Sequence, residues 1–255
     1  MIPQDTSPKR IFVGKLPIDV VDFEGALGVI DRLVRAGKGG TVYTPNVDHI
    51  VMAEHDERFR GAYQEASLSL VDGTPVLWAS RLLRTPLPVK VSGSDLVMPL
   101  MERAAARGYR VYFLGGAPGV AELAREKLEA ALPTIQIVGT DASRIDITGD
   151  MSQTDEIVER IRNARPDLVL VALGAPKQEI WSQARLSQLT PAVLIGVGAS
   201  LDFVAGIQKR APRWMSKTGV EWLYRLAQEP RRLAARYLLR DPEFCVILLR
   251  QLLSN

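Results

Sequence analysis

Four loops of the chain combine residue types that bind anions and move protons. Each loop follows a short apolar run and precedes a longer helical pattern. A carboxylate at such a position can take a proton from a hydroxyl group, and backbone N–H groups beside glycines can hold an anion. The loops are Thr44-Pro45-Asn46, Asp72-Gly73-Thr74-Pro75, Gly115-Gly116-Ala117-Pro118-Gly119 and Gly174-Ala175-Pro176-Lys177-Gln178-Glu179.

Asp72 is the candidate general base, because it directly follows an apolar strand that would expose its carboxylate at the mouth of a sheet. A turn or helix-capping aspartate is the commoner use of Asp-Gly-x-Pro. Thr44 and Asn46 could likewise bind sugar hydroxyls or cap the next helix. Lys177, Gln178 and Glu179 supply a cation, an amide and a carboxylate at the start of another predicted helix. They could contact a hydroxyl-rich ligand or simply form a solvated first turn.

The glycine loop at 115–119 predicts a site for phosphate. Its backbone could approach a diphosphate, whose charge the following helix N-terminus would stabilise. Glycines in such a turn also serve a need for positive φ alone, and the dinucleotide pattern G-x-G-x-x-G is incomplete. The loop by itself leaves both readings open.

The residues that could bind a metal ion do not have the spacing of a metal site. His49 and His55, the only histidines, are six residues apart, which does not place them on one face of a helix. The chain has no Asp-x-Asp pair to hold a divalent ion against a diphosphate. We therefore expect no metal or other cofactor, and the charge of a leaving diphosphate would be met by Lys, Arg or backbone N–H groups.

Short β-rich runs alternate with helical patterns, which predicts an α/β fold with a Rossmann-like, mainly parallel sheet and helices on both faces. Ligands then collect at the carboxyl ends of the strands, where the four loops lie. We expect strands at 10–13, 41–44, 68–71, 110–114, 135–138, 168–173 and 193–197. We expect helices at 47–65, 95–107, 120–132, 154–163 and 178–189.

The strand signal stops after Gly206, so the chain is predicted to divide into an α/β catalytic domain of residues 1–206 and a helical appendage of residues 207–255. The appendage has ten Lys and Arg against four Asp and Glu, and its helices should break near Pro230 and Pro242. Its arginines lie beside apolar residues. A basic amphipathic surface results, which fits the surface of an anionic membrane.

No stretch is apolar enough for a signal peptide or a membrane span, and the single cysteine, Cys245, is expected to pack in a reducing compartment. The protein is therefore expected in the cytoplasm, attached peripherally to the inner face of the plasma membrane. A membrane-bound monomer or a homo-oligomer that hides the apolar appendage surface would both satisfy this pattern.

Read in order, these segments resemble the WecG/TagA/CpsF family, also known as glycosyltransferase family 26. The resemblance runs from about residue 41 to residue 238. Beyond the four loops it rests on Ser92-Gly93-Ser94-Asp95, Phe113-Leu114-Gly115-Gly116, Gly196-Val197-Gly198-Ala199-Ser200-Leu201-Asp202-Phe203, Arg210-Ala211-Pro212 and Gly219-Val220-Glu221-Trp222-Leu223-Tyr224-Arg225-Leu226.

The resemblance implies an inverting, metal-independent transfer from a UDP-sugar donor to a polyprenyl-diphosphate-linked saccharide acceptor in bacterial cell-surface polysaccharide synthesis. The sugar would be a hexose: N-acetylmannosamine, its uronic acid, glucose or glucuronic acid. Asp72 would be the base, with Thr44 and Asn46 orienting hydroxyl groups and Gln178 contacting the transferred sugar. The nucleotide would lie along four further residues: Gly115, Gly116, Gly198 and Asp202.

The appendage would complete the site with arginines that neutralise the departing diphosphate. The candidates are Arg225, Arg232 and Arg236. Lys177 and Glu179 would complete the substrate-binding set. Lys90 stands where relatives often have Arg before the Gly-Ser-Asp segment, so the charge is kept and the two-pronged guanidinium is lost.

Two other functions fit parts of the sequence. A nucleotide- or nucleic-acid-binding module without enzymatic activity would use the basic tail to follow phosphates, although no nucleic-acid motif is present and we expect no nucleic-acid partner. A dinucleotide-dependent oxidoreductase would bind its dinucleotide at the Rossmann-like sheet, but the incomplete glycine pattern weakens this hypothesis.

Overall fold

A computed structural model of the chain describes residues 8–149, 151–212, 215 and 220–254. Its centre is a six-stranded sheet in the order β4-β3-β8-β7-β5-β6, and every neighbouring pair is parallel. The predicted parallel α/β sheet is confirmed. Its strands are β3 (Gly40–Tyr43), β4 (Leu68–Ser69), β5 (Arg110–Gly115), β6 (Gln136–Asp141), β7 (Leu168–Ala172) and β8 (Val193–Gly196).

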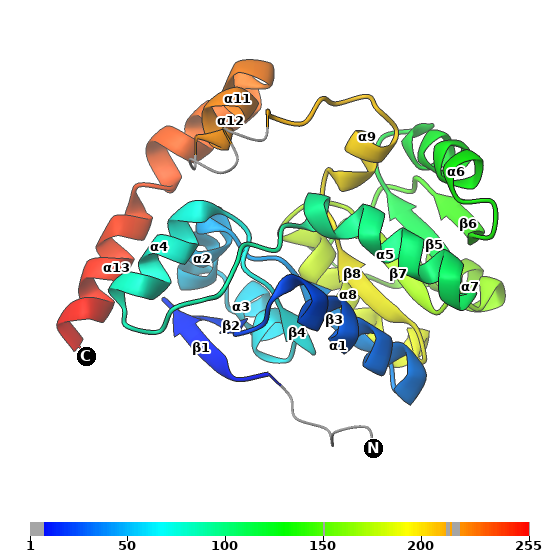
Figure 1. Cartoon of the computed structure of the whole chain (residues 1–255), viewed down its shortest axis with the longest axis horizontal. Coiled ribbons are helices and arrows are strands. Elements are labelled where there is room, and N and C mark those ends of the chain that lie inside the picture. Colours follow the sequence, from blue (N-terminus) through cyan, green and yellow to red (C-terminus); the bar gives the residue numbers. More distant parts are fainter. Residues whose placement is uncertain (1–7, 150, 213–214, 216–219, 255) are drawn as a thin grey trace.

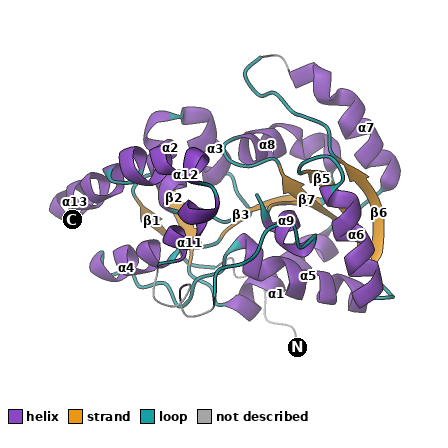
Figure 2. Ribbon diagram, turned by 90° about the horizontal axis from the view of Figure 1, so that it is seen from above, coloured by secondary structure: helices purple, strands orange, loops and turns teal. Residues whose placement is uncertain are grey.

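Helices cover both faces of the sheet (Figures 1 and 2), because successive strand residues point to opposite sides and both sets are apolar. Val111 and Phe113 of β5 belong to one hydrophobic cluster, and Tyr112 and Leu114 to the other. The first cluster includes residues of α1 (Phe23–Ala36), α5 (Gly93–Arg107), α6 (Val120–Ala131) and α9 (Ser200–Val204). The second includes residues of α2 (Val47–His55), α3 (Glu57–Gln64), α4 (Thr74–Leu82), α7 (Asp155–Ala164) and α8 (Lys177–Leu189).

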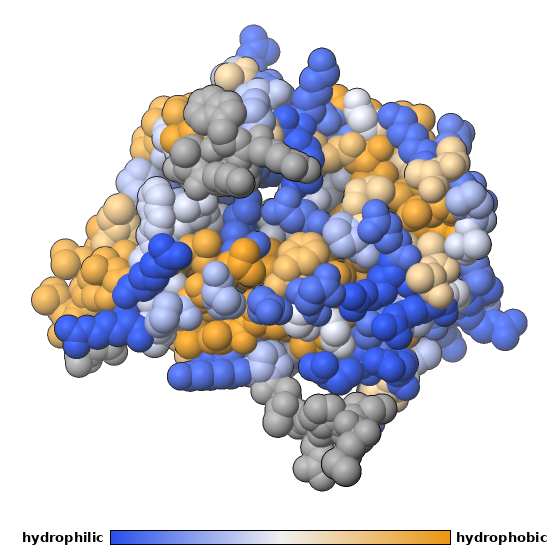
Figure 3. All heavy atoms as spheres, viewed as in Figure 1, coloured by the Kyte–Doolittle hydropathy of each residue, from blue (hydrophilic) through white to orange (hydrophobic). Residues whose placement is uncertain are grey.

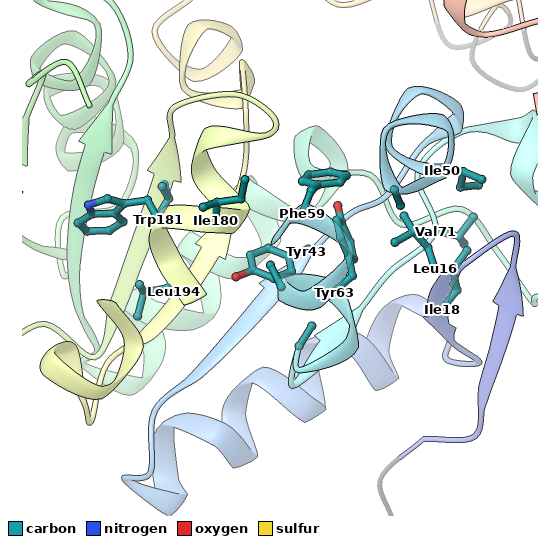
Figure 4. Packing of buried hydrophobic residues seen from close by; sticks show 14 of the residues in the cluster. Leu16, Ile18, Tyr43, Ile50, Phe59, Tyr63, Val71, Ile180, Trp181 and Leu194 are labelled. Atoms are coloured by element: carbon teal, nitrogen blue, oxygen red, sulfur yellow. The ribbon is translucent and has the colours of Figure 1, made fainter. Parts of the chain in front are cut away.

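Aromatic side chains fill the second cluster beside the predicted site. Tyr43 of β3 and Phe59 of α3 both pack edge-on against Tyr63, with ring centroids 5.2 and 5.1 Å from it (Figure 4). All three are fully buried. Such pairs stabilise a core beyond the area they bury, so the loops at this edge rest on a rigid base.

Two expectations about the N-terminal third are wrong. The run at 10–13 does not join the parallel sheet: β1 (Arg10–Val13) pairs antiparallel with β2 (Leu16–Asp19) in a separate hairpin. Gly14, with φ of +58°, allows the tight turn between them. The helix expected at 47–65 is two helices, since Asp56 takes an extended conformation and its carboxylate caps the second by accepting from Phe59 N–H.

The C-terminal residues form helices that return to the core. They are α11 (Glu221–Gln228), α12 (Pro230–Ala235), the π-helical η2 (Arg236–Arg240) and α13 (Glu243–Ser254). The remaining short element, η1 (Met151–Thr154), is a 3-10 turn that precedes α7 in the middle of the chain. The expected breaks near Pro230 and Pro242 are confirmed. Among the described helices, none is long and apolar enough to cross a membrane.

The last helix, α13, is fixed to the hairpin. Gln251 accepts a hydrogen bond from Gly14 N–H and donates one to the carbonyl of Phe12, at 2.8 and 3.0 Å. Ile247 is buried in the same cluster as α2 and the hairpin. Because these contacts join residues more than 230 positions apart, the C-terminus holds the appendage over the start of the chain.

Candidate active site

Two neighbouring cavities lie at the carboxyl ends of the strands. The first, called the glycine-loop cavity, has a volume of about 540 Å³. The second, called the Asp72 cavity, has a volume of about 440 Å³. The glycine-loop cavity is lined by residues that include Gly115, Gly116, Ser143, Arg144, Lys177, Gly198 and Asp202. The Asp72 cavity is lined by core and appendage residues that include Asn46, Asp72, Lys90, Trp222, Arg225, Arg236 and Tyr237.

Asp72 lies at the end of the strand path that leads from β4 to α4. Its N–H donates to the carbonyl of Pro45 at 2.8 Å, so the loops after β3 and β4 are held side by side. Gly73, with φ of +103°, then turns the chain into α4. This backbone leaves the Asp72 side chain partly exposed in the cavity, as a general base requires.

Burial raises the pKa of Asp72 from 3.8 to about 6, although the positive charges of Arg225 and Lys90 pull it down. Desolvation disfavours the carboxylate and the nearby cations favour it, so the group titrates close to neutrality. A carboxylate with this pKa is ionised at pH 7 and remains basic enough to accept a proton. The electrostatics therefore fit the role predicted for Asp72.

Asn46 both caps α2 and contacts the appendage. Its side-chain oxygen accepts from His49 N–H at 3.3 Å and from Arg236 Nη2 at 3.0 Å. Thr44 is buried instead, and lies beside Gly93, where an added Cβ would be 3.4 Å from the Thr44 hydroxyl. Thr44 is therefore not part of the described lining of either cavity.

Basic side chains from both parts of the chain meet at the Asp72 cavity. Lys90 Nζ lies 3.4 Å from Glu221 of the appendage, and Arg225 Nε lies 3.5 Å from the same carboxylate. Arg236 Nε is 3.2 Å from Asp48, which is buried at the start of α2. The structure thus brings Lys90, Arg225 and Arg236, which were predicted to bind substrate or diphosphate, to the cavity that Asp72 lines. Arg232 is in α12, but its side chain is outside the described part of the chain, as is Gly219.

Backbone contacts shape the glycine-loop cavity. Gly115 has φ of +94°, and a Cβ there would lie 2.7 Å from the carbonyl oxygen of Ala172. Gly116 N–H donates to the same carbonyl at 3.0 Å. Only glycine permits this approach of the loops after β5 and β7. Lys177 lines the cavity and donates to the carbonyl of Ile145 at 3.0 Å, which fixes the loop after β6.

Gln178 and Glu179 are buried beneath the cavities and are absent from their described linings. Gln178 accepts from Gly198 N–H at 3.0 Å and donates to Glu179 Oε1 at 2.8 Å. Burial raises the pKa of Glu179 to about 7. It also lowers the pKa of His49 to about 3, with Arg236 contributing, and His49 Nδ1 lies 2.7 Å from the Tyr63 hydroxyl. Gln178 therefore holds the loop after β8, and its predicted contact with the sugar stays a prediction.

Three polar residues that line the glycine-loop cavity were missed by sequence reasoning: Ser143, Arg144 and Gln208. The first two follow β6, which extends to Asp141, three residues beyond the expected strand. A predicted strand that ended at Asp141 would have placed the loop of Ser143 and Arg144 at the carboxyl edge of the sheet with the other site loops. Cys245, expected to pack in the interior, is exposed and lines the Asp72 cavity. In the described part of the chain, no group of three or more His, Cys, Asp or Glu side chains could hold a metal ion.

The sequence model of the Glycosyl transferase WecG/TagA/CpsF family matches residues 11–255. The chain belongs to this family. The resemblance drawn from ordered motifs is confirmed, and the match includes both the sheet and the C-terminal helices. Family membership makes the chain a glycosyltransferase of bacterial cell-surface polysaccharide synthesis and decides against the nucleic-acid-binding module and the oxidoreductase.

Three relatives resemble this chain over 70% or more of their own length. One is an N-acetylglucosaminyldiphosphoundecaprenol N-acetyl-beta-D-mannosaminyltransferase of Bacillus spizizenii, 31% identical over 84% of this chain and 80% of its own length. Proteins of the same name from Staphylococcus aureus strains MW2 and NCTC 8325 are 31% and 32% identical, over 75% and 72% of this chain and 73% and 70% of their own lengths.

Proposed function

We propose that the chain is an inverting, metal-independent hexosyltransferase that uses a UDP-sugar donor and a polyprenyl-diphosphate-linked saccharide acceptor. The names of the relatives point to N-acetylmannosamine as the sugar and to N-acetylglucosamine on diphosphoundecaprenol as the acceptor. The observation that carries this proposal is the Asp72 carboxylate, which is partly exposed in a cavity lined by core and appendage residues, with Arg225 and Lys90 as its nearby cations.

In this proposal Asp72 accepts the proton of the acceptor hydroxyl while that oxygen forms a bond to the anomeric carbon of the sugar. The bond from the anomeric carbon to the UDP oxygen breaks, and UDP leaves with the electron pair. A single displacement from the opposite face inverts the configuration. Asn46, beside Asp72, orients hydroxyl groups. The buried Thr44 helps to hold the loop after β3 in place.

The negative charge that develops on the diphosphate is stabilised without a metal. Lys90, Arg225 and Arg236 reach the Asp72 cavity, and we assign Arg232 to the same task. Preorganised cations at a leaving group stabilise the transition state more than the ground state. Because Arg225 and Arg236 come from residues 207–255, this appendage completes the site that the catalytic domain, residues 1–206, begins.

The nucleotide part of the donor is assigned to the glycine-loop cavity. Gly116 and Gly198 leave room for phosphates to approach the backbone, and Gly115 lines the same space and allows the close approach of the Ala172 carbonyl. Lys177 and Asp202 also line this cavity. Gln178 and Glu179 serve the site by positioning Gly198. The acceptor is membrane-bound, so the basic appendage would attach the protein to the cytoplasmic membrane surface.

The test is release of free UDP from a panel of UDP-sugars, with a lipid-diphosphate N-acetylglucosamine acceptor, in detergent containing EDTA. We expect acceptor-dependent release by the wild type and loss of at least a hundredfold in Asp72→Asn, whose folding is checked by circular dichroism. Activity that requires a divalent metal would refute metal independence. Activity that survives in folded Asp72→Asn would remove Asp72 from the mechanism.

A further inference from the structure

An exposed apolar stripe runs along α4 away from the Asp72 cavity. It begins at Pro75, which lines the cavity, and continues at Trp78 and Leu82. Spacings of three and four residues place these side chains on one side of the helix. Trp78 and Leu82 are 54% and 56% exposed, so the stripe is turned away from the core.

A second apolar stripe runs along α13 from the same cavity. Cys245 lines the cavity, and Leu249 and Leu252 follow at intervals of four and three residues. Leu249 is 57% exposed, and Leu252 is half-buried against the core. The contacts of Gln251 with the hairpin hold this helix in place.

The two stripes belong to one end of the molecule. In Figure 1, α4 and α13 lie beside each other at the left, and Figure 2 shows β1 between them. The space-filling view shows hydrophobic residues gathered over this end (Figure 3). An exposed tryptophan beside a leucine helix is typical of a surface that meets apolar material.

The cavity carries charged groups and the stripes carry none. The cavity wall has the cations of Lys90, Arg225 and Arg236 together with the carboxyl groups of Asp72, Glu221 and Asp241, whereas Trp78, Leu82 and Leu249 outside it are apolar or aromatic. A ligand that matches both parts has a polar head and a long apolar tail. An interface between two copies of the chain would have no reason to begin at lining residues of a charged cavity.

We propose that the stripes, called the lipid track (Pro75, Trp78, Leu82, Cys245, Leu249 and Leu252), bind the first isoprene units of the acceptor and lead its tail to the bilayer. This inference rests on the proposed function, because it assigns the lipid portion of the proposed acceptor. It gives α4 of the core, as well as the appendage, a part in lipid recognition.

The kinetic test compares two acceptors that have the same diphosphate saccharide, one with a polyprenyl chain and one with a short, water-soluble alkyl chain. We expect the ratio of kcat/KM for the long-chain acceptor to that for the short-chain acceptor to fall about tenfold in Trp78→Glu and in Leu249→Glu. Met98→Glu is the matched control, since Met98 is an exposed apolar residue of α5, away from the track. The milder Trp78→Ala guards against misfolding.

A second measurement does not depend on turnover. A polyprenyl diphosphate with a diazirine in its second isoprene unit is cross-linked to the wild type and mapped by mass spectrometry. Cross-links within 75–82 and 245–252 support the track even if no donor is turned over, in which case the proposed function fails alone. Cross-links elsewhere, or an unchanged acceptor ratio in active Trp78→Glu and Leu249→Glu, overturn the track. Loss of a dimer in these variants with an unchanged ratio would assign the stripes to self-association and overturn it equally.

Discussion

The substitution Asp72→Asn should abolish transfer and, at neutral pH, stabilise the fold. The wild-type carboxylate is ionised in water after unfolding but sits in a partly desolvated cavity in the folded protein, where its pKa rises from 3.8 to about 6. Above pH 6, folding must therefore keep an unfavourable charge in place. Asparagine has nearly the same shape and no charge, so it removes that cost along with the base.

The size of the effect follows from the pKa. A change from 3.8 to about 6 corresponds to about 3 kcal/mol at 1.36 kcal/mol for each tenfold change in ionisation. Asp72 is partly exposed, and screening by solvent reduces this to about 1–2 kcal/mol. For a chain of this size, that is a rise of about 2–8 °C in Tm.

The sign depends on pH. A carboxyl whose folded pKa is raised adds stability below its unfolded pKa and loses that contribution as the pH rises through the folded pKa. The difference in Tm between Asp72→Asn and the wild type should therefore be smallest near pH 4, grow up to about pH 6 and stay constant above it. Wild-type kcat/KM should rise over the upper part of this range, because the base must be ionised.

Differential scanning fluorimetry from pH 4 to pH 8.5, paired with UDP release at each pH, measures both effects. Asp56→Asn is a control, because Asp56 is also a loop carboxylate but caps α3 and should destabilise when its charge is removed. A Tm difference for Asp72→Asn that is negative or independent of pH would refute the desolvation argument. Activity without dependence on pH near 6 would refute the assignment of the base.

Four further substitutions test the rest of the site. Gly115→Ala should lower the free energy of unfolding by about 2 kcal/mol or more, because the new Cβ would lie 2.7 Å from a backbone carbonyl oxygen. Gly119→Ala should lower it by only about 1 kcal/mol, because Gly119 has a φ of +82° but open space around it. Urea unfolding measures both values. Gln178→Leu should raise KM for the UDP-sugar about tenfold with a smaller change in kcat, because a buried N–H of the loop after β8 loses its acceptor. Arg236→Lys should lower kcat/KM about tenfold with a Tm change under about 3 °C, because a lysine keeps the charge near Asp48 but loses the two-pronged guanidinium.

Each of these tests has a distinct contradictory result. Equal destabilisation by the two glycine variants would show that the close approach at Gly115 has no energetic consequence. An effect of Gln178→Leu on kcat alone, with KM unchanged, would place Gln178 at the reacting atoms after all. Full activity in Arg236→Lys would mean that charge alone, without guanidinium geometry, satisfies the diphosphate.

The sequence located most of the site because parallel strands bring their carboxyl ends to one edge. Asp72, Asn46, Gly115, Lys177 and Gly198 lie at or after the carboxyl ends of five strands, between residues 46 and 198, and the structure gathers them at two adjacent cavities. Polar residues and glycines that directly follow an apolar run can be recognised from the sequence alone, without knowledge of the tertiary contacts. The order of strands was not needed for that step.

Side-chain direction was not readable in the same way. Gln178 and Glu179 follow Lys177 at a helix start, yet Lys177 lines a cavity while the other two point into the core. A helix turns about 100° per residue, so neighbours in sequence face different surroundings. The antiparallel hairpin of β1 and β2 was missed for a related reason: the strand signal at 10–13 is the same whether the partner strand is next in sequence or far away.

Burial separates the roles of the two carboxyls with raised pKa. Glu179 has a pKa of about 7 and Asp72 a pKa of about 6, so pKa alone would rank Glu179 as the better base at neutral pH. Glu179, however, is fully buried, accepts a hydrogen bond from Gln178 and lines neither described cavity. Asp72 has weaker intrinsic basicity but lines the cavity that we propose for the acceptor. Because a base must reach its proton before its pKa matters, access favours Asp72 over Glu179 as the proposed base, and the contacts of Glu179 fit a residue that positions Gln178 and the loop after β8.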